Sequence, residues 1–184
     1  ADFVMSPPLR PAAELPALWS ALAEGTLDVV STDHCPFLRR HRDIANFATM
    51  PNGVAGVEER LALLWTCGVV AGRISASRFV ELVATAPARI FGLAPAKGSI
   101  EPGADADLVV WNPDAEWEIR AAAQRSRCDS SVYEGLRVQG RAETVLVRGR
   151  IVVEGGEVVE TLEPGRCLRR RRLTPRRGVD SIRA

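Results

Sequence analysis

VVSTDHCPF (residues 29–37) joins an apolar run to an aspartate, a histidine and a cysteine. With the residues before it, the stretch reads TLDVVSTD (26–33), which predicts a short strand near residues 27–32 that is buried on both faces. Asp33 would then stand where the strand ends and a loop begins. In parallel sheets and barrels, functional side chains gather at the carboxyl ends of the strands. The stretch therefore predicts an α/β fold with a candidate site at Asp33.

Strand and helix signals alternate on both sides of this stretch. An extended run near residues 2–5 predicts another strand, which Pro7 and Pro8 end. Apolar residues spaced i, i+3, i+4 and i+7 then predict an amphipathic helix that stops at Gly25, with the stripe Leu15, Leu18, Trp19 and Leu22. After a polar loop at 38–50, helices are predicted over 57–72, 76–85 and 87–93, the last opened by Thr85 and Pro87.

The pattern changes near residue 95, where alternating β runs replace helices. These runs cover 106–113, 116–121, 142–149, 150–156 and 157–160, and RGR and EGGE between them predict hairpin turns. We therefore predict an α/β part over 1–94, a β part over 95–163 and an Arg-rich tail over 164–184. Two strands with their helices cannot form a stable parallel layer, so we expect the α/β part to complete a sheet whose other strands lie outside this chain.

Composition excludes several classes of protein. None of the apolar runs approaches the roughly 18 to 20 residues that a membrane span needs, and the start lacks the pattern of a signal peptide. The four cysteines are far apart and form no CxxC pair, which argues against a zinc finger and predicts reduced thiols in a cytoplasmic protein.

Charge is unevenly distributed, although the net charge is only +1. The tail from residue 164 holds eight arginines and one aspartate, so the rest of the chain is acidic. Such a tail could bind nucleic acid or dock on an acidic neighbouring subunit. No aromatic platform accompanies it, which favours the docking arm over nucleic acid.

Asp33 has two interpretations on the residues alone. A carboxylate at a strand end can ligate a divalent metal and accept a proton from metal-bound water. It can equally cap a turn, with His34 as a packed or surface residue. Spacing does not separate these readings, because an isolated Asp-His pair is a weak signal.

Several motifs that occur together and in order resemble the C-terminal part of the hydantoinase/dihydropyrimidinase family of cyclic amidohydrolases. They are VMSPPLR (4–10), STDHCPF (31–37), PNGVAGVEERL (51–61), TAPARIFGL (85–93), KGSIEPGADADLVVWNP (97–113) and YEG (133–135). GADADLVVW alone would indicate only the wider superfamily. SPPLR and TDHCPF favour the hydantoinase branch over allantoinases and dihydroorotases.

The resemblance implies the last portion of a metal-dependent (β/α)8 barrel, followed by strands of a β-sandwich that both chain termini build. Strand seven of the barrel would lie near residues 2–5 and strand eight near 27–32. A His-x-His pair, a carboxylated lysine, further metal-binding histidines and an oxyanion-stabilising tyrosine would lie upstream of residue 1. We therefore expect this chain alone to bind metal weakly and to have no measurable hydantoinase activity.

The resemblance also implies roles for individual residues. Asp33 would be a ligand of one of two divalent ions, expected to be zinc, and the base that carries a proton from the bridging hydroxide to the leaving ring nitrogen. Ser6 and Asn52 would hold a cyclic ureide or imide through main-chain groups. His34 would bind no metal and would either support the residues that do or pack beside them. Family membership further implies a homodimer or homotetramer.

Three alternatives stay open at this point. The chain could belong to a non-catalytic assembly protein on the same scaffold, although such relatives typically lack the aspartate that Asp33 represents. It could be an allantoinase-like or dihydroorotase-like enzyme. It could also be a short binding module that uses its Arg-rich tail.

Overall fold

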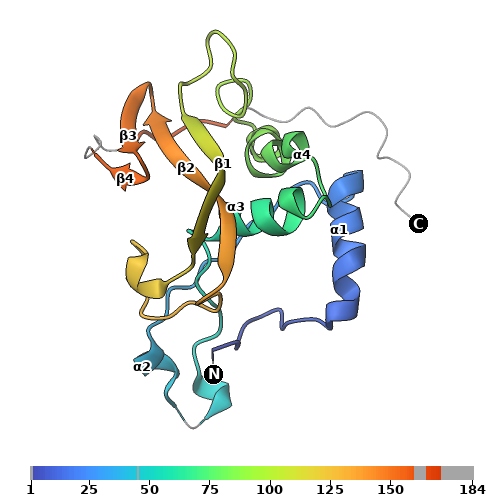
Figure 1. Ribbon diagram of the computed structural model, residues 1–184, viewed down its shortest axis with the longest axis vertical. Coiled ribbons are helices and arrows are strands. Elements are labelled where there is room, and N and C mark those ends of the chain that lie inside the picture. The colour runs from blue at the N-terminus through green and yellow to red at the C-terminus, as the bar shows by residue number, and fades with distance from the viewer. Residues whose placement is uncertain (1, 45, 160–164, 171–184) are drawn as a thin grey trace.

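The computed structural model describes residues 2–44, 46–159 and 165–170 (Figure 1). A four-stranded sheet forms one side of the molecule, helix α1 stands on the other, and α3 lies between them. The strands of the sheet are β1 (Leu108–Glu118), β2 (Arg137–Val147), β3 (Arg150–Glu154) and β4 (Glu157–Val158).

The helical segments are short, and several follow one another without a break. They are η1 (Ala12–Glu14), α1 (Leu15–Glu24), α2 (Arg39–Arg42), η2 (Phe47–Thr49), α3 (Arg60–Leu64), η3 (Trp65–Val70), α4 (Ala76–Val80), η4 (Glu81–Thr85), α5 (Ala86–Ile90) and η5 (Ala121–Ala123). Two of them, η3 and η4, are π-helical, while η1, η2 and η5 are 3₁₀ turns. The predicted loop at 38–50 thus contains two short turns, α2 and η2.

Helix α1 confirms the prediction from its apolar stripe. Pro16 stands in its first turn, where a missing amide hydrogen costs nothing. Gly25 ends it with a left-handed φ of 86°, a conformation that suits glycine. None of its residues is buried, and Leu15 is 51% exposed. The stripe therefore exists but is only partly covered.

The prediction of separate helices over 76–85 and 87–93 is wrong, because α4, η4 and α5 run on without a break. Thr85 keeps helical angles, and its hydroxyl donates to the Gly98 carbonyl at 2.9 Å. The π-helical turn η4 precedes Pro87. Such turns occur as short interruptions inside α-helices, so the chain passes the proline without ending the helix.

Arg78 fastens α4 to the end of α1 and to the run that follows it. Its guanidinium donates to the carbonyls of Leu22 at 2.7 Å and Leu27 at 2.8 Å, and pairs with Glu81 at 2.7 Å. The residues just before the Asp33 segment are therefore held from the α4 side.

Two apolar clusters form the core. The first comprises the buried residues Leu64, Ile74, Phe79 and Leu82 between the helices. The second comprises Ala62, Ile119 and Val138 and joins α3 to the sheet. Because this second cluster draws on both regions, the helical and β regions share a core, while the change from helices to strands falls between Ile90 and Leu108.

The hairpin turns confirm the predictions at RGR and EGGE. The strands pair antiparallel in the order β1-β2-β3-β4. Arg148 and Gly149 have φ of 52° and 78°, and Gly155 and Gly156 have 59° and 81°. Two successive positive φ values are typical of the tight turns that match the twist of paired strands.

A bulge interrupts β1 opposite Gly140. Pro113 lies in this bulge, where a strand tolerates a residue without an amide hydrogen, and its carbonyl accepts from Gln139 Nε2 at 2.9 Å. A Cβ at Gly140 would lie 2.6 Å from side-chain atoms of both Trp65 and Trp111. The absence of a side chain at Gly140 thus lets two tryptophans pack closely against the β2 backbone.

Lys97 anchors the loop before β1. Its ammonium pairs with Asp105 at 2.9 Å and with Asp107, whose other oxygen accepts from the Arg148 amide at 2.8 Å. The hydrogen bond that Lys97 donates to Asp107 lowers the pKa of Asp107 and raises the pKa of Lys97. The Asp107 carboxylate therefore joins the loop to the β2–β3 turn, through its ion pair with Lys97 and its hydrogen bond from the Arg148 amide.

The predicted strands near 2–5 and 27–32 are not formed within the described residues, and Val29, expected to be buried, is 38% exposed. A strand exists only when a neighbour completes its hydrogen-bond ladder. The Val30 amide donates to the Leu82 carbonyl at a long 3.4 Å, and the Val30 carbonyl accepts from the Arg60 guanidinium at 2.8 Å, which is no strand ladder.

Among the described residues, no helix is long and apolar enough to cross a membrane. Of the predicted tail, only residues 165–170 are described, and they are exposed. The prediction for the remainder of 164–184 lies outside the described residues.

Candidate active site

The three residues predicted to form a site lie on three segments that the structure brings together. The amide of Gly53 donates to the Val4 carbonyl at 3.0 Å, and the amide of Cys35 donates to the Val54 carbonyl at 2.9 Å. Ser6, Asp33 and Asn52 therefore stand on adjoining backbone segments, although they are far apart in the sequence. All three residues are exposed.

Gly53 is the residue that permits this close approach. Its φ is +131°, and a Cβ there would lie 2.6 Å from Cys35 Cβ and 2.7 Å from Cys35 Sγ. Only glycine combines that backbone angle with so short a distance to a neighbouring side chain. The sequence signal PNG predicts a turn, whereas its packing against Cys35 becomes visible only in the structure.

Asp33 adopts a positive φ of 48°, which is uncommon for a residue other than glycine. Aspartate tolerates this region better than most side chains, at a cost of about 1–2 kcal/mol. Within the described residues its carboxylate makes no hydrogen bond or ion pair, so the reading of Asp33 as a side-chain cap finds no support. The exposed carboxylate is free to meet a ligand.

Two neighbouring glutamates fasten the candidate site to the β region. Glu59, only 1% exposed, accepts from the Ser131 hydroxyl at 2.8 Å and from the Gln124 amide. Glu58 accepts from the backbone amides of Arg125, at 3.0 Å, and Ser126. Sequence reasoning missed both residues, and the adjacent pair in VEERL was the signal available.

Tyr133 is close to Glu59 and Ser131. Its amide donates to Ser131 Oγ at 3.1 Å. Burial raises the pKa of the Tyr133 hydroxyl, and the charge of Glu59 raises it further. The phenol therefore stays protonated well above neutral pH.

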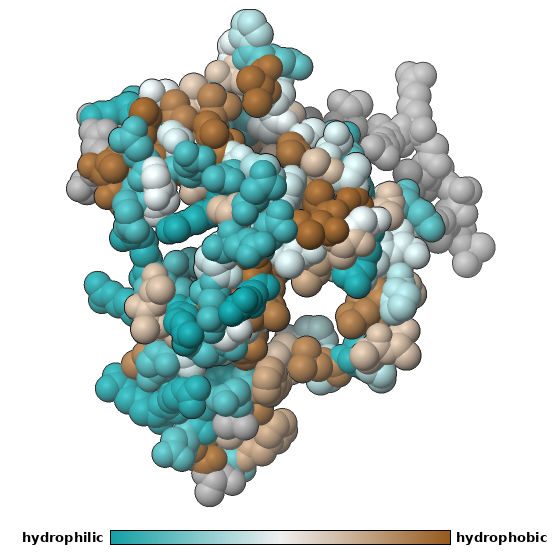
Figure 2. Space-filling model, in the orientation of Figure 1, coloured by the Kyte–Doolittle hydropathy of each residue, from teal (hydrophilic) through white to brown (hydrophobic). Residues whose placement is uncertain are grey.

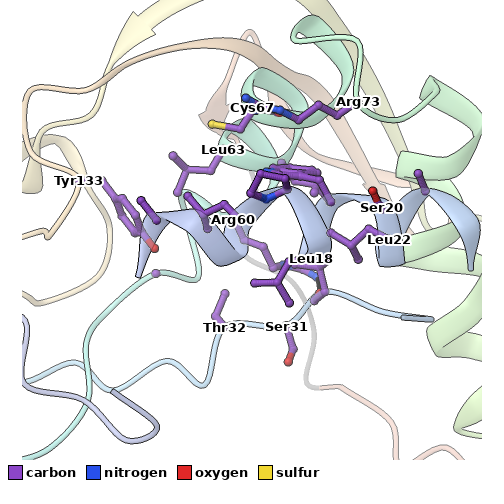
Figure 3. A pocket seen from close by; sticks show the side chains of 18 of the residues that line it. Leu18, Ser20, Leu22, Ser31, Thr32, Arg60, Leu63, Cys67, Arg73 and Tyr133 are labelled. Carbon is purple, nitrogen blue, oxygen red and sulfur yellow. Dashed lines mark hydrogen bonds between the residues drawn. The ribbon is translucent and has the colours of Figure 1, made fainter. Parts of the chain in front are cut away.

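A groove of about 1030 Å³ is a separate feature, and it lies between α1, residues 30–32 and α3. Figure 3 shows Leu18 and Leu22 on one side of it and Leu63 and Tyr133 on the other. In the space-filling view a gap separates part of α1 from the rest of the molecule, with apolar side chains on its rim (Figure 2). Its lining includes Thr32 and Val54 but not the three predicted residues, so the groove adjoins the candidate site without containing it.

The residues present do not form a metal centre. In residues 2–44, 46–159 and 165–170, no group of three or more His, Cys, Asp or Glu side chains could hold an ion. The four cysteines are free thiols, as predicted. Asp33 offers one carboxylate, which is too few ligands for a bound ion.

The chain matches known proteins over most of its length. The sequence profile of the amidohydrolase family matches residues 5–152. The chain therefore belongs to the amidohydrolase family.

Within that family its relatives are hydantoinases and dihydropyrimidinases. It is 45% identical over 175 residues to a D-hydantoinase of Ralstonia pickettii, and 43% identical over 158 residues to a dihydropyrimidinase of Arabidopsis thaliana. These matches cover 94% and 85% of this chain but 38% and 30% of the relatives.

The comparison of structures agrees with the comparison of sequences. A crystallised D-hydantoinase from Thermus sp. superimposes with a TM-score of 0.84 at 41% identity, over 87% of this chain and 35% of that one. The resemblance that the motifs predict is thus confirmed, and the chain spans less than two fifths of the curated relatives it matches.

Proposed function

We propose that this chain forms one edge of the active site of a hydantoinase-type enzyme, which hydrolyses the ring amide of a hydantoin or a 5,6-dihydropyrimidine. The convergence of residues 4–6, 33–35 and 52–54 through main-chain hydrogen bonds carries the proposal. The names of the relatives, D-hydantoinase and dihydropyrimidinase, support it.

Each residue of the edge has a role in this proposal. Asp33, with its free and exposed carboxylate, takes a proton from the attacking water and passes it to the ring nitrogen as the amide bond breaks. Proton transfer by a positioned side chain typically contributes about 10²–10⁴-fold to the rate. The main-chain groups of Ser6 and Asn52 orient the ring, which requires the close approach of the two segments that Gly53 permits.

The amidohydrolase family is metal-dependent as a rule, but this chain's own residues do not fit a binuclear centre. It has two histidines. The Nδ1 atom of His34 accepts from the Gly56 amide at 3.1 Å, and that of His41 accepts from the Leu38 amide at 3.3 Å. We therefore assign Asp33 as one ligand, and expect the other ligands, including a carboxylated lysine, from segments that this chain lacks.

Those segments would also complete the fold. We propose that further strands of a (β/α)8 barrel pair with residues 2–5 and 27–32 and cover the apolar groove beside α1. A second sheet of a sandwich would pack on one face of β1. Val109 and Val110, which point to opposite faces of this strand, are 52% and 53% exposed. An isolated chain would then lack both the metals and measurable activity.

The free thiols suit a cytoplasmic location. We further propose a homodimer or homotetramer in which the Arg-rich tail docks on an acidic neighbouring subunit. Nucleic acid is not an expected partner.

The experiment compares hydrolysis of dihydrouracil and a 5-substituted hydantoin by the chain alone and by the enzyme completed with the missing barrel segments. We expect turnover only in the completed enzyme, and a loss of at least about 10²-fold in Asp33→Asn. Asp28→Asn, an exposed aspartate five residues earlier in the same segment, is the matched control and should retain activity. Full activity in Asp33→Asn, or tight zinc with turnover in the isolated chain, would contradict the proposal.

A further inference from the structure

His34 directly follows Asp33, and its side chain is turned to the backbone of another segment. Its Nδ1 atom lies 3.1 Å from the Gly56 amide nitrogen and 3.3 Å from that of Val57. An imidazole nitrogen accepts hydrogen bonds only where it carries no hydrogen, so this geometry places the ring N–H on Nε2. One atom therefore serves as the acceptor for two successive amides.

These bonds act on the far end of the loop that carries Asn52. The near end is held by main-chain bonds, from the Gly53 amide to Val4 and from the Cys35 amide to Val54. Side-chain substitutions leave those bonds in place, whereas the third attachment depends on the imidazole. His34 thus connects residues 56–57 to the segment that carries Asp33, the candidate proton carrier.

We propose that His34 is a positioning residue, which fixes the Asn52 loop relative to Asp33 by accepting the two amide hydrogens. The functional part of this inference rests on the proposed roles of Asn52 and Asp33, while the hydrogen-bond part stands on geometry alone. If the loop orients the substrate ring in both the ground state and the transition state, loosening it raises KM more than it lowers kcat.

Three variants separate this role from simple packing. In His34→Asn, the side-chain Oδ1 takes a place close to that of Nδ1 and can accept from both amides. In His34→Gln the acceptor lies one methylene further out, nearer the place of Nε2, and in His34→Ala it is absent. Gln fills more of the imidazole volume than Asn does, so an effect of packing would favour Gln, whereas an effect of the acceptor favours Asn.

The first measurement is amide hydrogen exchange by NMR on the full chain, with circular dichroism to show that each variant is folded. We expect exchange at Gly56 and Val57 to accelerate about tenfold in His34→Ala and His34→Gln, the equivalent of one ordinary hydrogen bond, and to change little in His34→Asn. Unchanged exchange at both amides in His34→Ala would overturn the proposal, as would equal behaviour of the Asn and Gln variants.

The second measurement is steady-state kinetics in the completed enzyme. We expect KM to rise in His34→Gln with a smaller change in kcat, and His34→Asn to stay near wild type. If exchange responds as expected but KM does not, the positioning role is refuted although the hydrogen bonds exist. If wild-type enzyme hydrolyses neither substrate, the proposed function fails, and the exchange result still decides whether His34 holds the loop.

Discussion

Gly53→Ala tests the contact between the Asn52 loop and the Asp33 segment most directly. An alanine at a φ of +131° is strained, and its Cβ would lie 2.6 Å from Cys35 Cβ. The backbone strain costs about 1–2 kcal/mol, and forcing a methyl group into an occupied space costs about 1–3 kcal/mol. We therefore expect the free energy of unfolding to fall by about 3 kcal/mol.

Urea unfolding of the wild type and of Gly53→Ala, monitored by circular dichroism, measures this difference in the free energy of unfolding. Gly103→Ala is the matched control, because Gly103 has a φ of +95° but no atom within 4 Å of the added Cβ. It should show the backbone strain alone, about 1–2 kcal/mol. The remainder in Gly53→Ala is then the cost of the clash with Cys35.

A double-mutant cycle with Cys35→Gly isolates that clash. Removing the Cys35 side chain leaves Phe37, 3.9 Å away, as the remaining neighbour of the added methyl group. We expect Gly53→Ala to cost about 1–2 kcal/mol less in the Cys35→Gly background. If Gly53→Ala costs no more than Gly103→Ala and the cycle shows no coupling, the two loops are not in contact and the proposed site edge does not exist.

Three further predictions concern stability. Replacing the buried Glu59 by alanine should cost about 2–4 kcal/mol in urea unfolding, because it leaves two partly buried donors without this acceptor, whereas Glu58→Ala at the surface should cost about 1 kcal/mol; equal costs would refute the role of Glu59 as a buried acceptor. Because Lys97 lowers the pKa of Asp107, the stability it adds is present above the ordinary carboxyl pKa of 3.8 and is lost as the pH falls through the lowered value. The difference in Tm between wild type and Lys97→Met should thus be larger at pH 6 than at pH 2.5, and a difference independent of pH would contradict this. Leu82→Ala, at a position with 0% exposure, should lower the free energy of unfolding by about 2–5 kcal/mol in the same assay, and a loss below 1 kcal/mol would show that the helical core is elsewhere.

The sequence predicts the elements that local interactions decide. Helix α1 follows from its stripe and from Gly25, and the hairpin turns follow from the residues of the turns themselves. The strand predicted at 27–32 fails because pairing depends on other segments, and the break predicted at Pro87 fails because a π-helical turn precedes it.

In the candidate site, too, local sequence predicts some features, whereas others depend on residues far apart in the chain. Motifs single out Asp33 and Asn52, but nothing local predicts that the Cys35 amide reaches Val54. Glu59 was missed because its partners, Gln124 and Ser131, lie 65 and 72 residues further along the chain. A buried carboxylate is identified only by its surroundings, which the sequence does not give.

The two sides of the Asp33 segment, one facing the β region and one facing α1, differ in how much of their surface is buried within this chain. Toward the β region, the Glu59 carboxylate is buried and accepts from Ser131, and the apolar cluster of Ala62, Ile119 and Val138 is buried within this chain. Toward α1, a groove of about 1030 Å³ exposes apolar side chains of a helix that has no buried residue. An amphipathic helix is stabilised by burying its stripe, so the proposed barrel segments would stabilise the α1 face, whereas the main-chain bonds at Gly53 and Cys35 form within this chain. The edge that carries Ser6, Asp33 and Asn52 should therefore keep its geometry before the rest of the proposed barrel assembles on it.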